Sequence, residues 1–419
     1  MKTRTTYVGV PAHIQPMVDW VLRLIESNHD AKITEASLTI GLEADTEILL
    51  SKQFYQDLAA GIYLHDHHMP RGPFIELPCG EIDYLSSIFY LVNCIQEYDC
   101  KDLDKYGRFK YDNSLQKKWS VTTKNLVWEY IQAFCDKHNI SYRKLPVNAC
   151  YLSHDIDFIY RGWKREGLKA AQQGSLGKAA DIVSSRFLGR PIFANVDEIA
   201  NLEALAGHNS TFYWIASQEN GVNGIINADY DMNDPLVLQM MSSAEDRGCE
   251  HGMHKSAAKS SLQEEAAHFD GKLLSNRYHY LKFTLPQAWA ELEAAGIDVD
   301  CSLGFAEHYG YRNSYGLPFR PYDLTTGRTL DLLVVPLHIM DATLTDYMSI
   351  PEQEVASTML EWIQAVREHT LIGVLWHNTN LSEKVSHEMR AAYVSLLDYM
   401  QKHDFESKTP TSLLEDCRK

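Results

Sequence analysis

Cysteine is sparse in this sequence and forms no recognisable pattern. The eight cysteines are scattered between Cys79 and Cys417, with no CxxC pair and no closely spaced framework. Closely spaced cysteines hold small secreted domains together or bind structural zinc. Their absence excludes both kinds of protein and predicts reduced, mostly buried thiols.

Long apolar runs are also absent. No stretch approaches the ~18 consecutive apolar residues that a membrane-spanning helix needs. The N-terminal segment has two early cations but no apolar core followed by a small-residue cleavage site, as a secretion signal requires. We therefore predict no transmembrane segment, and we expect the protein in the cytoplasm.

Positive charge is in short supply. The chain carries 39 Lys and Arg against 56 Asp and Glu, a formal net charge of -17. A phosphate backbone or an anionic bilayer surface would be repelled on average by this charge. We therefore expect no nucleic acid partner.

The rest of the composition is that of an ordinary globular protein, with 45% hydrophobic and 23% charged residues. A single core rarely grows beyond ~250 to 300 residues. The 419 residues therefore predict two domains, or one large α/β domain with an extension. Nothing in the composition indicates the oligomeric state.

Two regions differ in their hydrophobic pattern. Residues 1–145 contain helix-period segments at Pro16–Ser27 and Thr122–His138, and we interpret this region as a small α/β domain of unknown role. Residues 146–419 alternate short apolar runs with helical stretches such as Pro286–Ala295 and Glu352–Glu368. The expected strands are Ala149–Ser153, Thr211–Ala216, Cys249–His254, Val299–Leu303, Leu330–Leu337 and Leu371–His377. This pattern predicts a parallel barrel or an open parallel sheet.

Two carboxylates follow the first of these strands. Reactive groups of parallel barrels and sheets lie at the C-terminal ends of the strands. Asp155 and Asp157 are two residues apart, so both side chains face the same side of a strand. Close carboxylates imply a raised pKa or a bound metal. An isolated pair of this kind is more often a turn or a helix cap.

Histidine and arginine follow later strands. His254 ends the third strand, where its imidazole can meet a metal held by Asp157, whereas His251 faces the opposite side and is expected to be packed or hydrogen-bonded. His377 closes the last strand and is suited to protonating a leaving amine, although a core histidine would look the same. Arg312 offers a fixed cation that could orient a carboxylate, with a surface ion pair as the alternative.

The ordered motifs SHDIDF, EHGMHKSA, DCSLGF with GYR, and VLWHN resemble those of the polysaccharide deacetylase family, whose members remove N- or O-acetyl groups from carbohydrates. The resemblance covers residues 148–410. Residues 80–110, with IDYLSSIFYLVNCIQEYD and DKYGRF, resemble an N-terminal domain that precedes certain bacterial deacetylase domains. The resemblance implies an α/β fold, a distorted (β/α) barrel preceded by a smaller α/β domain.

The resemblance also implies roles for individual residues. The family's first motif supplies a base and then a metal ligand, which fall on Asp155 and Asp157. Its metal-binding histidine falls on His254, its orienting arginine on Arg312 and its general acid on His377. These positions agree with those found at the strand ends.

One position departs from the family pattern. The family carries a second metal-binding histidine four residues after the first, and here that residue is Ala258. We take His279 as the third ligand, because it lies at an expected strand end and related sequences with an HDxD motif resemble this one there. An Asp/His/His set suits Zn first, and Co, Ni, Mn or Fe as well.

The resemblance implies a metal-dependent deacetylase that hydrolyses an acetamide on a sugar or glycan precursor. A small non-sugar amide or an O-acetyl ester would suit the same groups, and a catalytically inactive glycan-binding barrel is the alternative outside enzymes, which Ala258 favours. Aromatic side chains that could stack on sugar rings, or equally fill the core, are Tyr309, Tyr311, Tyr315 and Trp376.

Overall fold

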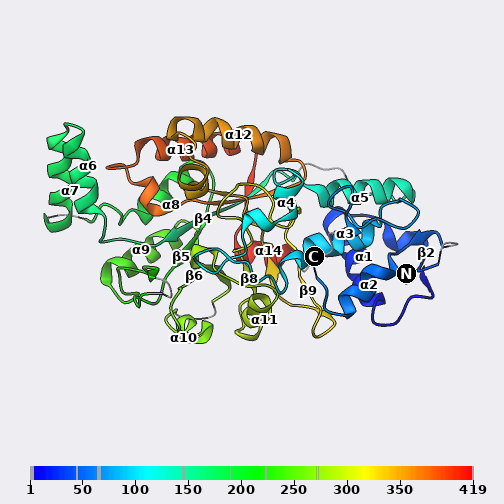
Figure 1. Ribbon diagram of the computed structural model, residues 1–419. Helices are drawn as coiled ribbons and strands as arrows, with labels where there is room; N and C mark the ends of the chain where they lie inside the picture. Colours follow the sequence, from blue (N-terminus) through cyan, green and yellow to red (C-terminus); the bar gives the residue numbers. More distant parts are fainter. Residues whose placement is uncertain are drawn as a thin grey trace.

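A computed structural model describes residues 4–43, 46–63, 68–143, 147–188, 190–221, 224–269, 271 and 273–417. The fold is mixed α/β, with a curled parallel sheet in the middle of the molecule and helices around it (Figure 1). The N-terminal elements lie to the right of this sheet, and the helix pair α6 and α7 lies at the far left (Figure 1). Within the described residues, no helix is long and apolar enough to cross a membrane.

The central sheet has eight strands in the order β11-β8-β7-β6-β5-β4-β13-β12, and every neighbouring pair is parallel. β14 (Glu406–Ser407) adds to β4. The strands are β4 (Ala149–Ile156), β5 (Thr211–Trp214), β6 (Glu250–Lys255), β7 (Ser275–Tyr278), β8 (Val299–Asp300), β11 (Leu333–Val334), β12 (Ile339–Met340) and β13 (Leu371–Leu375). The six predicted strands are therefore present, although four are shorter than expected.

One segment of chain crosses between the two edges of this sheet. After β11, the backbone N–H of Val335 donates to Asp300 at 2.8 Å, beside β8. His338 then donates to Gly373 at 3.0 Å, within β13 on the other side. A Cβ on Gly373 would lie 2.2 Å from the carbonyl oxygen of Pro336, so this close approach requires glycine. The crossing gives the curled sheet the shape of a half-barrel.

Helices cover the outside of the half-barrel. All eight residues of β4 are buried, because the sheet is covered on both faces as parallel sheets usually are. Figure 1 shows α12 and α13 along one side and α11 on the opposite side. The helices are α6 (Trp163–Gln172), α7 (Leu176–Leu188), α8 (Val196–Leu205), α9 (Pro235–Glu245), α10 (Leu262–Ala266), α11 (Gln287–Ala294), α12 (Val355–Val366), α13 (His387–Lys402) and α14 (Pro410–Asp416). β9 (Tyr322–Asp323) and β10 (Arg328–Thr329) form a separate antiparallel pair.

The N-terminal region has a three-stranded parallel sheet of its own, in the order β1-β2-β3. Its elements are β1 (Arg4–Val8), α1 (Gln15–His29), β2 (Ser37–Gly41), β3 (Ile48–Leu49), α2 (Lys52–Ala59), α3 (Tyr84–Val92), α4 (Leu115–Lys118) and α5 (Leu126–Lys137). Helix α3 begins where the side chain of Asp83 accepts a hydrogen bond from the N–H of Ser86 at 3.0 Å. Every side chain from Leu85 to Val92 is buried, so α3 lies inside the protein.

The N-terminal region and the half-barrel share one hydrophobic core. That core joins Phe89 and Ile131 from the N-terminal helices to Trp289 and Leu337 from the half-barrel. The predicted boundary between residues 145 and 146 lies outside the described residues. Two independent domains would each have a hydrophobic core of their own. The division into two domains therefore stays a prediction.

Candidate metal centre and active site

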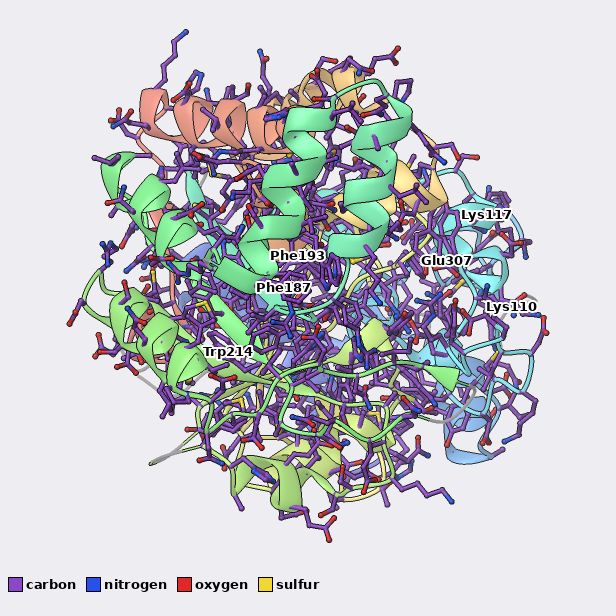
Figure 2. All side chains as sticks on the ribbon, turned by 90° about the vertical axis from the view of Figure 1, so that its left-hand side faces the viewer. Lys110, Lys117, Phe187, Phe193, Trp214 and Glu307 are labelled. Carbon is purple, nitrogen blue, oxygen red and sulfur yellow. The ribbon has the colours of Figure 1, made fainter. Side chains whose placement is uncertain are left out.

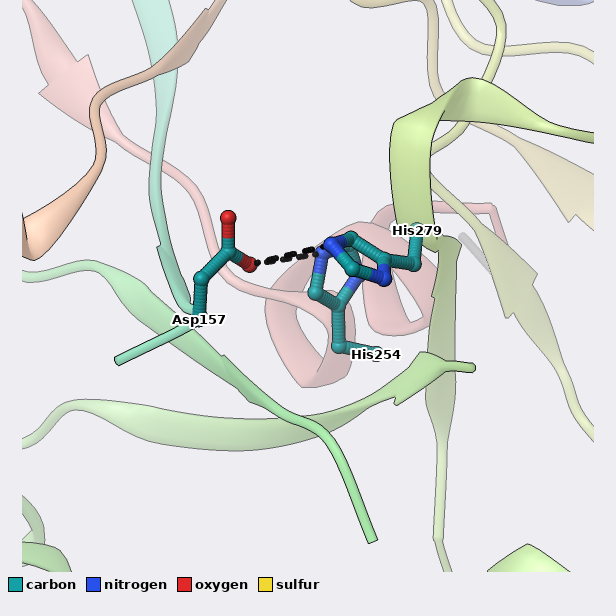
Figure 3. Close-up of side chains that lie close together, drawn as sticks. All are labelled: Asp157, His254 and His279. Carbon is teal, nitrogen blue, oxygen red and sulfur yellow. Dashed lines mark ion pairs between the residues drawn. The ribbon is translucent and has the colours of Figure 1, made fainter. Parts of the chain in front are cut away.

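Three potential metal ligands meet at the C-terminal ends of neighbouring strands. Asp157 follows β4, His254 lies on β6 and His279 follows β7 (Figure 3). Oδ1 of Asp157 lies 3.4 Å from Nε2 of His254 and 3.6 Å from Nε2 of His279. One ligand atom from each residue lies within 4.8 Å of the others. The predicted group of Asp157, His254 and His279 is therefore assembled in one place.

The two imidazoles are held with their Nε2 atoms toward Asp157. Nδ1 of His254 donates to the carbonyl oxygen of Arg277 at 3.0 Å, because a carbonyl only accepts. Nδ1 of His279 pairs with Oδ1 of Asn227 at 3.0 Å, and that oxygen also accepts the N–H of Ala257. With Nδ1 protonated, a neutral ring carries its lone pair on Nε2, as a metal ligand requires.

The facing atoms are short of hydrogen-bond partners. Among the described residues, Oδ1 of Asp157 and Nε2 of His279 are buried and accept or donate no hydrogen bond. Burial lowers the pKa of His279. Burial alone would raise the pKa of Asp157, but the nearby imidazoles outweigh it and hold the pKa of Asp157 well below its usual range. A neutral imidazole beside an ionised carboxylate is the donor set that divalent transition metals accept. The residues therefore fit a divalent metal.

Asp155 lies next to this group on β4. Its Oδ2 is 3.3 Å from Nε2 of His254, and its Oδ1 is 3.6 Å from Nε of Arg277. Arg277 is fully buried on β7, where its guanidinium also packs over the ring of Tyr213. Nothing in the sequence marks Arg277, because the strand Ser-Asn-Arg-Tyr has no apolar run. A buried cation thus lies near one oxygen of the carboxylate, and His254 lies near the other.

Arg312, which the resemblance places beside the catalytic carboxylate, has other partners. Its Nε and Nη2 atoms donate to Glu97 at 2.9 and 2.6 Å, and its Nη1 atom donates to the carbonyl oxygen of Gly304. All of its guanidinium nitrogens are therefore engaged within a buried pair that joins the N-terminal region to the half-barrel. This corrects the predicted contact of Arg312, and Arg277 is the arginine that contacts Asp155.

His377 follows β13 and faces Asp157 from another side. Its Nε2 lies 3.8 Å from Oδ2 of Asp157, and its Nδ1 lies 2.6 Å from Oδ1 of Asp341. Asp341 also accepts hydrogen bonds from the backbone N–H of His377 and the side chain of Asn380, both at 2.8 Å. Burial lowers the pKa of His377, but the carboxylates of Asp341, Asp157 and Asp155 outweigh it and raise this pKa to about 10. Asp341 follows β12, so it too lies at the C-terminal end of a strand, where reactive groups are expected.

His251 behaves as its position on the strand predicts. It lies on β6 three residues before His254, and its ring faces away from the site. Its Nδ1 accepts the indole N–H of Trp214 at 3.0 Å, and its Nε2 pairs with the carbonyl oxygen of Met241. Both nitrogens are satisfied, so His251 serves packing.

The aromatic side chains near the site differ from those expected. Tyr311, Tyr315 and Trp376 are fully buried core residues and Tyr309 is half-buried, so three of the four predicted stacking surfaces are closed. Three other tyrosines, named here the tyrosine rim, are partly exposed, and one of them, Tyr280, contacts His279: Tyr106, Tyr280 and Tyr347.

Arg108 of the N-terminal region connects this rim. Its guanidinium donates to the carbonyl oxygen of Tyr280 at 2.9 Å and to the hydroxyl of Tyr347 at 3.4 Å. It also lies over the ring of Tyr106, which is 5.2 Å from the ring of Tyr280. The ring of Tyr280 is in turn 4.6 Å from that of His279. The N-terminal region thus forms part of the surroundings of the candidate metal centre.

Comparisons with known proteins give limited information. A family of unknown function (DUF7033) matches residues 25–141, and no curated protein matches the chain. The 4-alpha-glucanotransferase from Thermococcus litoralis is similar over 64% of this chain, with 13% identity and a TM-score of 0.38, and the chain covers 40% of that protein. A protein assigned as a polysaccharide deacetylase from Mycobacterium smegmatis is similar over 64% of this chain and 94% of its own, with 10% identity and a TM-score of 0.35. Similarity of this extent assigns neither a fold family nor an activity.

Proposed function

We propose that the protein is a metal-dependent deacetylase of the polysaccharide deacetylase type, with residues 146–419 as the catalytic domain. The observation that carries this proposal is the group of three ligand atoms from Asp157, His254 and His279, which lie within 4.8 Å of one another, with Oδ1 of Asp157 and Nε2 of His279 buried and without a hydrogen-bond partner among the described residues. Aligned acceptors in a buried site repel one another unless a cation lies between them. The resemblance of the sequence motifs to those of deacetylases indicates the reaction, the hydrolysis of an acetamide.

Asp157, His254 and His279 would hold the metal, and Zn is the first candidate for this donor set. A bound divalent cation supplies Lewis acidity, which polarises an acyl carbonyl and makes a water molecule more acidic. The carbonyl oxygen of Arg277 and the side chain of Asn227 fix the two imidazoles in place, so the histidines need no reorientation to bind.

Two groups outside the ligand set would move protons. Asp155 takes a proton from the attacking water, and Arg277 positions this carboxylate from 3.6 Å away. His377 gives a proton to the departing amine, so that the C–N bond breaks without expelling an amide anion. Asp341 binds Nδ1 of His377 at 2.6 Å and thereby leaves Nε2 facing the site.

The tyrosine rim supports an acetylated sugar or glycan precursor as the substrate. Tyrosine rings present flat apolar faces with a polar edge, as the faces and hydroxyls of a sugar ring require. Arg108 is paired with Asp104 at 2.8 Å, so the rim offers stacking surface in place of a free cation. A small non-sugar amide or an O-acetyl ester would not need these rings.

Metal content tests the proposal directly. We expect near-stoichiometric divalent metal in protein purified without chelator, and loss of that metal in His254→Ala and in His279→Ala, as measured by elemental mass spectrometry. His251→Ala is the matched control, because it removes a half-buried histidine from the same strand without touching the site. Wild-type protein that holds no metal even after reconstitution would contradict the proposal and favour a binding protein.

Turnover of acetylated sugars tests the chemistry separately. Asp155→Asn should retain the metal but lose activity by about 10²-fold or more, which is the usual contribution of a general base. Tyr280→Ala should raise KM for a sugar substrate and leave hydrolysis of a small acetamide unchanged. If Tyr280→Ala hydrolyses both substrates as well as wild type does, the small-amide alternative would be favoured over the sugar substrate. An Asp155→Asn variant with full activity would remove the assigned base.

A further inference from the structure

Helices α6 and α7 form a hairpin that stands apart from the rest of the fold. The hairpin begins six residues after Asp157 and therefore leaves the sheet at the end that carries the candidate site. Its helices contact each other more than any other element, and Figure 1 shows them at the edge of the molecule farthest from the N-terminal region. A hairpin of this kind buries little apolar surface in the fold.

Helix α7 carries exposed apolar side chains in addition to those that it packs against the fold. The packed side chains include Ile182, which lies with Ile192 and Phe193 in a small core cluster. The exposed residues, named here the stripe, are spaced as one face of a helix, and the ring of Phe187 also lies 5.5 Å from that of Trp163 on α6. The stripe consists of Leu176, Ala180, Val183 and Phe187. Leu176 is 73% exposed and Phe187 is 67% exposed, and Figure 2 shows Phe187 on the side of the molecule where the hairpin faces the viewer. A surface helix normally keeps such residues against the core.

The hairpin also carries positive charge in an acidic protein. Between Arg161 and Arg190 there are seven Lys and Arg residues and two Asp and Glu residues, a net charge of +5 in a chain of net charge -17. Lys164, Arg165 and Lys169 lie on α6 and are exposed. The 13 residues of α7 span about 20 Å, more than two Debye lengths at physiological salt. The cations of the hairpin are therefore partly screened from the acidic body.

We propose that the α6–α7 hairpin binds the surface of an anionic lipid bilayer. Large apolar side chains next to exposed lysine and arginine are what a helix lying in the membrane interface requires, because the apolar stripe enters the acyl boundary while the cations contact lipid phosphates. Average net charge opposes such binding, but the attraction depends on charges within a Debye length of the lipid. This surface function does not depend on the proposed hydrolase activity.

Sedimentation with lipid vesicles tests the proposal. The full-length protein should sediment at low salt with phosphatidylcholine vesicles that contain about one quarter phosphatidylglycerol, and stay in solution with phosphatidylcholine alone. High salt should release it. Leu176→Ser/Val183→Ser/Phe187→Ser and Lys164→Glu/Arg165→Glu/Lys169→Glu should each reduce the bound fraction at least ~10-fold, since each basic residue near the lipid contributes about 1 kcal/mol.

A matched control removes exposed apolar residues elsewhere. Leu205→Ser/Leu238→Ser changes two exposed leucines of α8 and α9, and it should bind anionic vesicles like wild type. Wild type that stays in solution with anionic vesicles at low salt, or a control that loses binding as much as the stripe variant, would overturn the proposal. A wild-type dimer that becomes a monomer in the stripe variant, measured by light scattering, would assign the stripe to a second copy of the chain and also overturn it.

Discussion

Asp155 and Asp157 are two residues apart, yet their carboxylates have different neighbours. Asp157 faces three imidazoles, whereas Asp155 lies between His254 and the buried guanidinium of Arg277. A carboxylate surrounded by imidazole nitrogens is suited to share a cation with them. A carboxylate placed between a guanidinium and an imidazole, next to the ligand group, is suited to take a proton from a water molecule there. The two proposed roles follow from these surroundings.

Asp341 should matter for turnover but not for metal binding. Asp341→Asn keeps the size of the side chain but removes the negative charge beside Nδ1, and with it the main stabilisation of the protonated imidazole that would give its Nε2 proton to the leaving amine. We expect kcat to fall by about 10²-fold or more, with KM and metal content close to wild type. Steady-state kinetics and elemental analysis of the same preparation check this. Metal loss in Asp341→Asn would instead make Asp341 a structural support of the ligands.

Sequence predicted the ligand group better than its supporting residues. Asp157 and His254 were expected together because each lies at a strand end, and His279 was added because of its expected strand end and the family resemblance; the three do lie together. Arg277 and Asp341 were missed, because β7 and β12 have no long apolar run that marks them as strands. In the local sequence, a buried arginine that contacts the site carboxylate Asp155 looks the same as one that joins two regions of the protein, as Arg312 does.

Helix α3 begins at a carboxylate whose ionisation opposes folding. Burial raises the pKa of Asp83 to about 6, although N–H groups of Ser86 and Ser51 lower it in part. Since the folded protein binds this proton below about pH 6 and the unfolded chain only below the ordinary aspartate pKa of 3.8, this group adds stability as pH falls from 6 to 4. The gain in the free energy of unfolding is about 3 kcal/mol.

Asp83→Asn isolates this contribution. The variant keeps an oxygen that can cap α3, but it cannot titrate. The free energy of unfolding of wild type, relative to that of Asp83→Asn, should therefore rise on acidification from pH 7 to pH 4. Urea denaturation at several pH values measures this difference. A difference that stays constant with pH would mean that Asp83 keeps an ordinary pKa.

The pair of Glu97 and Arg312 joins the segment after α3 to the half-barrel. Both side chains are almost fully buried. Arg312→Leu should lower the free energy of unfolding by about 3 to 5 kcal/mol, because it leaves the charge of Glu97 buried without a partner. Glu97→Leu/Arg312→Leu should recover most of this loss, as measured by urea denaturation. A double variant as unstable as the single one would point to the bond with Gly304 instead.

Elements with strong periodicity were predictable and short strands were not. The helices expected at Pro16–Ser27 and Glu352–Glu368 correspond to α1 and α12, because an apolar face repeats through each of them. β7 is not among the six strands named from the apolar runs, although His279 was expected at a strand end, since its four residues are polar or aromatic and owe their burial to neighbouring strands. Tertiary pairing decides such strands, and the local sequence does not.

The whole chain should unfold as one unit if the shared core governs its stability. The core that joins Phe89 to Leu337, together with the Glu97–Arg312 pair, couples the N-terminal region to the half-barrel. We expect a single calorimetric transition whose van't Hoff and calorimetric enthalpies agree. Two separate transitions, with residues 1–145 melting independently, would restore the two-domain interpretation.

The crossing from β11 to β12 also bears on how the protein avoids self-association. An open parallel sheet ends in rows of unpaired N–H and C=O groups that can template strand addition by other chains, and so lead to fibrils. Here both terminal strands are two residues long, and the chain between them bonds to β8 on one side and β13 on the other. Val334 also exchanges hydrogen bonds with Phe319, which occupies the outer side of β11. The half-barrel thus offers little free edge for amyloid growth.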